Sequence, residues 1–219
     1  MDVNISSYTQ SSGYYNSYKG LKKIEKKVIK KYFKGKVLDL GCGCGRTTVH
    51  LDKMGLNVIS VDIIPDMIKI AKKKYPSIKF FSMDACKLAF KDKSVDTVFF
   101  SYNGIDYIHP EVNRIKALKE VERVLKDGGL FIYSSHNPWA LPFTFRPKFL
   151  LRNILRGTLF SRYKWDKESF GELYTYYGSP SKQRSLIEST TSLRFIEMVR
   201  NGFRDVYPHY IFVKPEGKK

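Results

Sequence analysis

The sequence of 219 residues lacks long apolar runs and has little cysteine. No apolar run approaches the roughly 20 residues that a bilayer-spanning helix needs, which argues against an integral membrane protein. Three cysteines, Cys42, Cys44 and Cys86, cannot form a disulfide framework, and the first residues lack a charged-then-apolar signal pattern. We therefore expect a cytoplasmic protein. No His/Cys pair has zinc-site spacing, so we expect no metal and interpret the cysteines as packing residues.

Acidic residues are also few. Lys and Arg number 39 against 21 Asp and Glu, which gives a formal net charge of +18. Residues 36–135 carry 16 basic and 12 acidic groups, whereas residues 136–219 carry 15 and 7. The basic flanks would attract an anionic partner such as RNA, a phosphorylated metabolite or an acidic membrane face, although solvated surface lysines explain the same composition.

Short apolar segments alternate with amphipathic ones along residues 21–135. Strands are expected at 36–40, 57–61, 78–81, 95–101 and 130–134, and helices at 21–34, 46–54, 65–74 and 111–126. This alternation indicates a doubly wound, Rossmann-like α/β fold with a mostly parallel sheet.

The alternation of strands and helices ends after residue 135. A helix at 181–189 and strands at 193–199 and 210–214 are expected, with the strands joined through Asn201-Gly202 and no helix between them. This predicts a C-terminal antiparallel pair that completes seven strands. Residues 136–180 form an aromatic, helical lid insertion within one domain of residues 21–219. The Tyr-rich residues 1–20 have no apolar face and predict a flexible arm.

Glycine occupies alternate positions of residues 41–45, between the first strand and its helix. Glycine lets backbone approach a ligand closely, and a helix N-terminus favours negative charge. Asp62 ends the second strand, where a carboxylate can accept hydrogen bonds from a ribose diol. A dinucleotide fingerprint would need glycine where Arg46 stands, and Asp39 suits an ammonium group better than a pyrophosphate. The pattern predicts a nucleoside-containing ligand at the carboxyl edge of the sheet.

Four ordered segments carry a resemblance to a known family: VLDLGCGCGRTT, VDIIPDMIKIAKKK, MDACKLAFKDKSVDTVFFSYNGIDYI and ALKEVERVLKDGGLFIYSSHNP. Over about residues 21–137 the sequence resembles class I S-adenosylmethionine (SAM)-dependent methyltransferases. The resemblance is to the small-molecule branch, similar to the type 11 domains of ubiquinone and menaquinone biosynthesis. It implies SAM as the cofactor.

The resemblance also implies where the cofactor binds. The methionine end of SAM is expected against Asp39, Gly41, Cys42 and Gly43, with Tyr15 or Tyr18 of the arm near its carboxylate. The ribose is expected at Asp62, and the adenine beside Ile63, Met67, Asp84 and Ala85. Tyr102 and Asn103 are expected beneath the sulfonium and methyl.

A general base is needed only if the methyl acceptor must lose a proton. The candidates near the ends of the fourth and fifth strands are Asp106, Tyr107, His109 and His136. His136 ranks above His109 because it is closer in sequence to the end of a strand, although a structural role would suit either histidine. Tyr102 is the second catalytic candidate, from its expected place beneath the sulfonium.

No Asp or Glu occurs from residue 128 to residue 165, whereas Lys148, Arg152 and Arg156 recur every four residues. Three interpretations stay open: a lid over the substrate, an interfacial cationic helix that admits a lipid-like substrate, and an RNA-docking surface. Methyl transfer to an O, N or C atom of a small molecule is the leading hypothesis. An RNA methyltransferase and a non-catalytic SAM-binding regulator are the alternatives.

Overall fold

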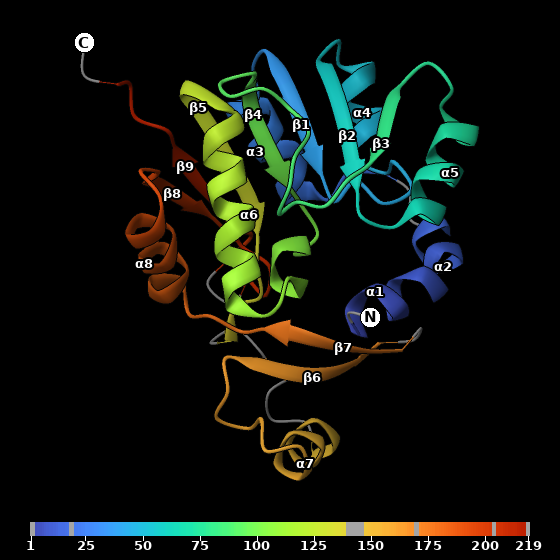
Figure 1. The fold of residues 1–219 in the computed structure, drawn as a ribbon, viewed down its shortest axis with the longest axis vertical. Helices are drawn as coiled ribbons and strands as arrows, with labels where there is room; N and C mark the ends of the chain where they lie inside the picture. Colours follow the sequence, from blue (N-terminus) through green and yellow to red (C-terminus); the bar gives the residue numbers. More distant parts are fainter. Residues whose placement is uncertain (1–2, 18–19, 139–146, 169–170, 203–204, 218–219) are drawn as a thin grey trace.

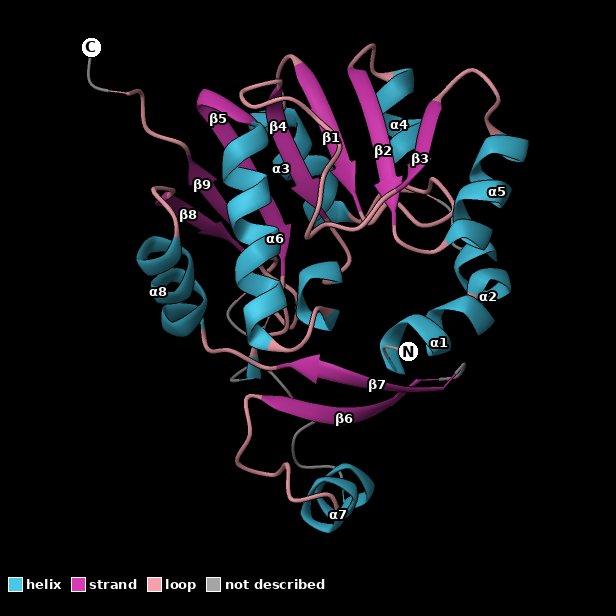
Figure 2. Cartoon of the chain, in the orientation of Figure 1, coloured by secondary structure: helices cyan, strands magenta, loops and turns pink. Residues whose placement is uncertain are grey.

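The computed structural model describes residues 3–17, 20–138, 147–168, 171–202 and 205–217. Seven strands form the central sheet in the order β3-β2-β1-β4-β5-β9-β8 (Figures 1 and 2). β1 to β5 run parallel to one another, and β9 runs antiparallel to both β5 and β8. The predicted fold class is confirmed. The strands are β1 (Lys36–Leu40), β2 (Asn57–Asp62), β3 (Lys79–Ser82), β4 (Val95–Phe100), β5 (Leu125–Ser134), β8 (Arg194–Val199) and β9 (His209–Val213).

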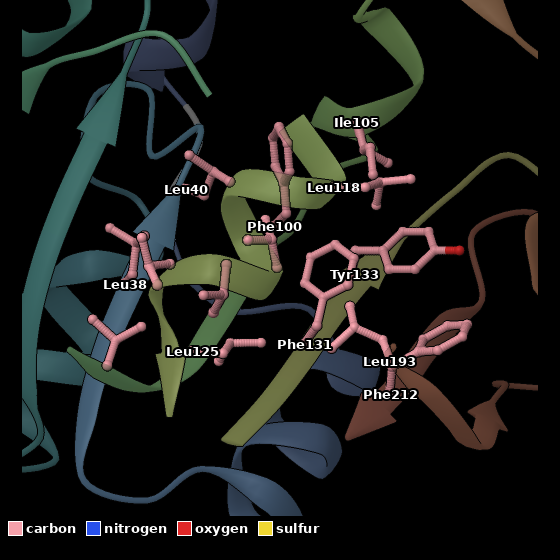
Figure 3. Packing of buried hydrophobic residues seen from close by; sticks show 14 of the residues in the cluster. Leu38, Leu40, Phe100, Ile105, Leu118, Leu125, Phe131, Tyr133, Leu193 and Phe212 are labelled. Carbon is pink, nitrogen blue, oxygen red and sulfur yellow. The ribbon is translucent and has the colours of Figure 1, made fainter. Parts of the chain in front are cut away.

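Helices cover both faces of this sheet because successive side chains of each strand point to opposite sides. Leu38 of β1 packs in one cluster with Leu118 (Figure 3). Val37 packs in another cluster, with Leu51. Among the residues that the structure describes, no helix has the length and apolarity that a membrane span needs. The helices around the sheet are α3 (Lys23–Tyr32), α4 (Thr48–Lys53), α5 (Pro65–Lys74), α6 (Glu111–Val124) and α8 (Pro180–Thr190).

β5 starts five residues before the predicted strand and includes the glycine pair that was expected to separate helix from strand. The backbone N–H of Gly128 donates to the carbonyl of Lys214 at 2.8 Å, and that of Lys214 donates to Gly129 at 2.9 Å. The segment after β9 therefore continues the hydrogen-bonded ladder as far as the glycines, where Gly128 adopts a left-handed φ of +72°.

The insertion contains helix α7 (Pro147–Leu155) and a separate hairpin of β6 (Tyr163–Glu168) and β7 (Gly171–Tyr176). The hairpin was not predicted. Tyr163 lies opposite Tyr176, and Trp165 lies opposite Tyr174, so cross-strand aromatic pairs stabilise it. The hairpin lies beyond the carboxyl ends of the central strands, with α7 outside it (Figure 1).

The amino-terminal segment forms two helices, α1 (Val3–Gln10) and α2 (Ser12–Ser17), where an arm without an apolar face was expected. The Asn4 amide donates to the carbonyls of Tyr107 and Tyr174 at 2.8 and 2.9 Å, and its oxygen accepts the N–H of Tyr174 at 2.8 Å. α1 is thus attached to β7 by the buried polar side chain of Asn4. The prediction of a flexible arm rested on the lack of an apolar face, and that criterion does not detect a polar contact of this kind.

Candidate functional site

A cavity of about 370 Å³ opens at the carboxyl ends of β1, β2 and β4, beneath α1 and a short 3₁₀ helix, η1 (Gly104–Tyr107). Asp39 and Asn103 are buried and do not line it, and Tyr18 lies outside the described residues. The other residues expected at the cofactor lie on its wall, namely Tyr15, Gly41, Cys42, Gly43, Asp62, Ile63, Met67, Asp84, Ala85 and Tyr102.

Asp62 connects β2 to the glycine loop. One oxygen of its carboxylate accepts the N–H of Gly43 at 2.7 Å, and the other accepts that of Ile64 at 2.9 Å. Burial raises the pKa of Asp62, and the backbone N–H groups oppose that rise. Each oxygen keeps a second lone pair, so the carboxylate can still accept hydrogen bonds from a ligand in the cavity.

The backbone at Gly41 requires glycine. Its φ is +68°, and a Cβ there would lie 2.6 Å from the ring of Phe100. The loop can therefore lie close against β4 and leave the cavity open above it.

Asp39 is fully buried near the carboxyl end of β1. One oxygen accepts the Thr48 hydroxyl at 2.7 Å, and Thr48 in turn accepts the Ser60 hydroxyl at 2.9 Å. The other oxygen of Asp39 has no hydrogen-bond partner among the described residues. Burial raises the pKa of Asp39 to about 7, although the Thr48 hydroxyl acts against this. An unsatisfied buried carboxylate oxygen suits a cationic ligand group.

Arg46, which stands where a dinucleotide motif has glycine, forms a two-pronged ion pair with Glu25 of α3. Nη1 lies 2.7 Å from Oε2 and Nη2 lies 2.6 Å from Oε1, with both side chains largely buried. Nη1 also donates to the carbonyl of Gly20 at 3.0 Å. Arg46 lines the cavity. Through its pair with Glu25 it joins the segment that follows the glycine loop to α3. Its side chain is therefore a structural clamp at the edge of the site.

Two consecutive residues after β4 adopt the left-handed conformation, Tyr102 with φ of +56° and Asn103 with φ of +60°. Such conformations cost roughly 1–3 kcal/mol each and cluster at functional sites. The ring of Tyr102 lies 4.1 Å from the Nζ of Lys22 and makes an edge contact with Tyr15 at 6.0 Å. The side-chain amide oxygen of Asn103 is buried and has no hydrogen-bond partner among the described residues. The backbone N–H of Asn103 donates to the hydroxyl of Ser134 at 2.9 Å.

The wall beyond Asp62 is largely apolar, with Ile63, Met67 and Met83. Asp84 closes this end, and one of its oxygens accepts the N–H of Cys86 at 2.8 Å. A flat heterocycle with an exocyclic amino group would meet apolar side chains on its faces and a carboxylate at its edge.

The cysteines are unsuited to nucleophilic chemistry at neutral pH. Burial raises the pKa of Cys42 well above its ordinary value and that of Cys86 to about 12. None of the three cysteines forms a disulfide, and the thiols of Cys42 and Cys86 are protonated near neutral pH. In the part of the chain that the structure describes, no group of three or more His, Cys, Asp or Glu residues could hold a metal ion.

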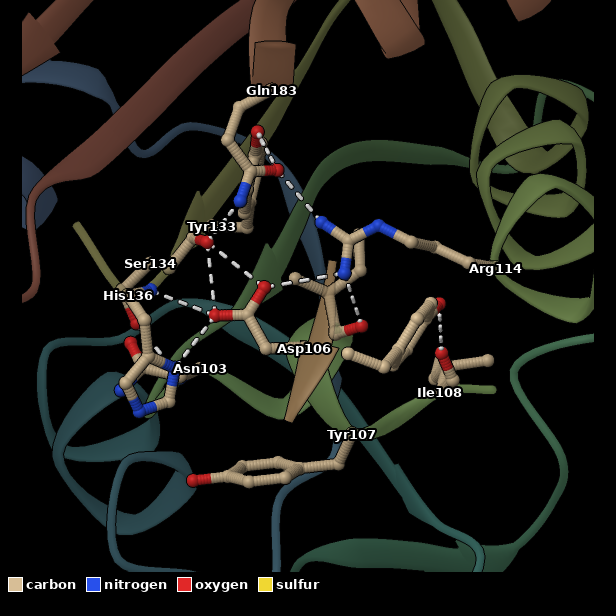
Figure 4. A network of polar contacts seen from close by, with 12 residues as sticks. Asn103, Asp106, Tyr107, Ile108, Arg114, Tyr133, Ser134, His136 and Gln183 are labelled. Atoms are coloured by element: carbon tan, nitrogen blue, oxygen red, sulfur yellow. Dashed lines mark hydrogen bonds and ion pairs between the residues drawn. The ribbon is translucent and has the colours of Figure 1, made fainter. Parts of the chain in front are cut away.

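His136 belongs to a buried polar network beside the cavity (Figure 4). Its Nδ1 lies 2.9 Å from Oδ2 of Asp106, and its backbone N–H donates to the same oxygen at 2.7 Å. Asp106 also accepts the Ser135 hydroxyl and faces Arg114 at 3.2 Å. Arg114 is 1% exposed and donates to Gln183 at 2.7 Å, so the carboxylate, the arginine and the imidazole are mutually positioned.

The two candidate histidines lie on different sides of the cavity wall. His136 does not line the cavity and is separated from it by Tyr107, whose ring makes an edge contact with the imidazole at 6.0 Å. His109 lines the cavity and packs against Tyr174 of β7. Sequence reasoning did not place Asn4 or Tyr8 on this wall, because both reach it only through the contact of α1 with β7. His109 was a sequence candidate, but it was ranked below His136.

The comparisons with known proteins agree with this geometry. Residues 37–129 match a family described as a methyltransferase domain. An uncharacterized protein of Methanocaldococcus jannaschii is 34% identical over 146 residues, which are 66% of this chain and 51% of that protein. The ubiquinone/menaquinone biosynthesis C-methyltransferase UbiE of Campylobacter jejuni is 32% identical over 152 residues, 61% of this chain and 60% of the relative. The chain therefore spans about half to three fifths of the length of these relatives.

Among solved structures, a SAM-dependent methyltransferase of Methanosarcina mazei superposes with a TM-score of 0.73 at 20% identity. The match covers 86% of this chain and 97% of the other. At that identity the likeness shows the fold.

Proposed function

We propose that this chain, which carries a class I SAM-dependent methyltransferase domain, transfers the methyl group of SAM to an O, N or C atom of a small-molecule acceptor in the cytoplasm. The observation that carries the proposal is the cavity at the glycine loop, with Asp62 on its wall and an unsatisfied oxygen of Asp39 behind the loop. Bound SAM supplies the methyl group and its own leaving group.

The residues of the cavity fit that cofactor. Asp62 would accept the ribose hydroxyls, while Asp84 and the backbone at Ala85 would hold the adenine between Ile63 and Met67. Gly41, Cys42 and Gly43 would face the methionine end, with the Asp39 carboxylate buried behind this loop. Tyr15 would close over the carboxylate of SAM. Tyr102 would lie beside the methyl, and the buried Asn103 would support the left-handed turn that carries it.

The Asp106–His136 pair is the proposed base for an acceptor that must lose a proton. A carboxylate at Nδ1 favours the tautomer with the proton on that nitrogen, which leaves Nε2 able to accept one. Tyr107 stands between this pair and the cavity, so its side chain must carry or permit the proton transfer. Tyr102 would position the acceptor rather than deprotonate it.

A small-molecule acceptor is favoured by the roof of the cavity. Asn4, Ile5 and Tyr8 of α1 line the cavity from above, and Asn4 is tied to both η1 and β7. A site covered in this way suits a compact acceptor. A relative from Campylobacter jejuni is named as a C-methyltransferase of ubiquinone/menaquinone biosynthesis, which supports a small-molecule acceptor. The net charge of +18 is the observation that favours the alternative of an RNA acceptor.

Incubation with methyl-labelled SAM and two acceptor pools tests the proposal, one pool being a small-molecule extract and the other bulk tRNA. We expect label in the small-molecule fraction. Label in tRNA would support the RNA alternative, and SAM binding without label in either pool would support a non-catalytic regulator.

Variants at the two histidines test the proposed base. His136→Ala should lower turnover by about 10²-fold and leave the affinity for S-adenosylhomocysteine (SAH) unchanged. His109→Ala serves as the matched control, and a larger loss of turnover with that variant would transfer the role to His109.

A further inference from the structure

The outermost part of the insertion exposes a cluster of large apolar side chains, called here the α7 patch. It comprises Leu151 and Ile154, each 57% exposed, Leu155 at 77% and Phe160 at 98%. In Figure 1, α7 lies on the far side of β6 from the main sheet. Isolated exposed apolar residues are common, but four within ten residues at one extremity indicate a contact surface.

The α7 patch is held on a well-anchored support. Asn153 on the opposite side of α7 is fully buried, and it donates to the Trp165 carbonyl at 3.0 Å and accepts the Trp165 N–H at 2.9 Å. The Nζ of Lys164 donates to the carbonyls of Thr158, Leu159 and Ser161. These contacts fix the loop that carries Phe160, so the exposure of its ring is built into the fold.

The surroundings of the patch carry a net positive charge, since Arg152 and Arg156 share the single carboxylate of Glu172. The patch lies within residues 128–165, which contain no Asp or Glu, and Lys148 at the start of α7 is exposed. The whole chain carries a charge of +18. An apolar surface with a basic border complements a bilayer that has acidic headgroups above an apolar interior.

RNA and a second copy of the chain fit the α7 patch less well than a bilayer does. RNA requires free cations and stacking surfaces, but Arg152 and Arg156 face Glu172, and Arg162 faces Glu111. A second copy of the chain would need roughly 800 Å² of buried surface per partner, more than four side chains provide.

We propose that the α7 patch docks this protein on an anionic bilayer surface, with its apolar side chains among the acyl chains and Lys148 at the headgroups. The hairpin beneath α7 also contacts the cavity roof, because Asn4 and His109 both meet Tyr174 of β7. Docking would therefore bring the roof of the cavity close to the membrane. The inference does not depend on the proposed methyl transfer.

Flotation of the full chain with vesicles tests this proposal. We expect binding to vesicles that contain about one third phosphatidylglycerol, weaker binding to pure phosphatidylcholine, and a loss of binding as salt is added. The double variant Leu155→Ser/Phe160→Ser should bind the anionic vesicles at least about tenfold more weakly. Met54→Ser/Val112→Ser is the matched control, since both residues are 55% exposed elsewhere on the surface.

Thermal unfolding and SAH binding should be unchanged in both double variants, which separates docking from folding and from the proposed function. The proposal is overturned if the protein does not bind anionic vesicles, or if the patch variant binds them like the control. It is also overturned if the patch variant loses self-association or tRNA binding while vesicle binding persists.

Discussion

Asp62 accepts the backbone N–H of Gly43 at 2.7 Å, so the end of β2 determines the position of the glycine loop that follows β1. The same carboxylate lines the cavity. One side chain thus shapes the loop and presents an acceptor to the ligand, and its removal should affect both.

Asp62→Ala should therefore weaken SAM and SAH binding. Loss of a charged acceptor typically costs about 1.5–3 kcal/mol, which corresponds to roughly 10- to 100-fold in the dissociation constant. Titration calorimetry with SAH measures it. Asp52→Ala, on the exposed side of α4, is the control, and equal affinities of the two variants would argue against a role of Asp62 at the ligand.

Gly41→Ala should both destabilise the protein and weaken SAH binding. The new Cβ would meet the Phe100 ring at 2.6 Å in a backbone region that side chains rarely adopt. Gly55→Ala is a matched control, because Gly55 has a φ of +77° with no atom within 4 Å of the added Cβ. Backbone strain alone should cost the control about 1 kcal/mol. Urea unfolding should show a larger loss for Gly41→Ala, and similar losses would mean that Phe100 moves aside.

Glu25→Gln should lower the free energy of unfolding by roughly 3–5 kcal/mol, since it leaves the buried Arg46 guanidinium without its counter-charge. Burial raises the pKa of Glu25, but the hydrogen bonds and charge of Arg46 outweigh it and hold that pKa below its ordinary value. Asp127→Asn breaks the exposed pair with Lys93 and should change the unfolding midpoint in urea far less. Equal shifts would show that the Arg46 pair is not a structural clamp.

The buried Asp39 predicts a specific dependence of stability on pH. Its pKa rises from an ordinary value of 3.8 to about 7, so between these values the unfolded chain loses the proton while the folded chain keeps it. The contribution of Asp39 to stability is complete below about pH 4 and is lost as the pH rises to about 7.

Asp39→Asn removes this titration and retains an acceptor for Thr48. The stability of the variant relative to the parent should therefore increase between pH 4 and pH 7, by a few kcal/mol if each pKa unit corresponds to about 1.4 kcal/mol. Urea unfolding at several pH values measures the difference in stability between the two proteins, to which titrating groups distant from Asp39 contribute nothing. Parallel profiles for the two proteins would contradict the assignment. Saturating SAH should reduce the difference if its ammonium group approaches Asp39.

The sheet and the glycine loop were predictable because their signals are local. Apolar strands such as residues 36–40 and the alternating glycines need only neighbouring residues to be recognised. The hairpin of β6 and β7 was missed because the alternation of Tyr163 and Trp165 with lysine and aspartate lies within residues 136–180, which were expected to form an aromatic, helical lid.

The roof of the cavity depends on contacts between distant parts of the chain. Asn4 binds Tyr174, which lies 170 residues later in the sequence, and no local sequence pattern predicts such a contact. The ranking of His136 above His109 also relied on sequence position alone and could not take account of contacts between distant residues. His136 follows β5 directly, yet the buried Asp106 holds its ring behind Tyr107, whereas His109 reaches the wall through the turn after η1.

Calorimetric titration of the full chain with SAH tests the central claim most directly. The account predicts saturable binding of one SAH per chain with a micromolar dissociation constant, and competition by SAM. The absence of heat with either ligand, or binding of a nicotinamide dinucleotide in their place, would contradict it.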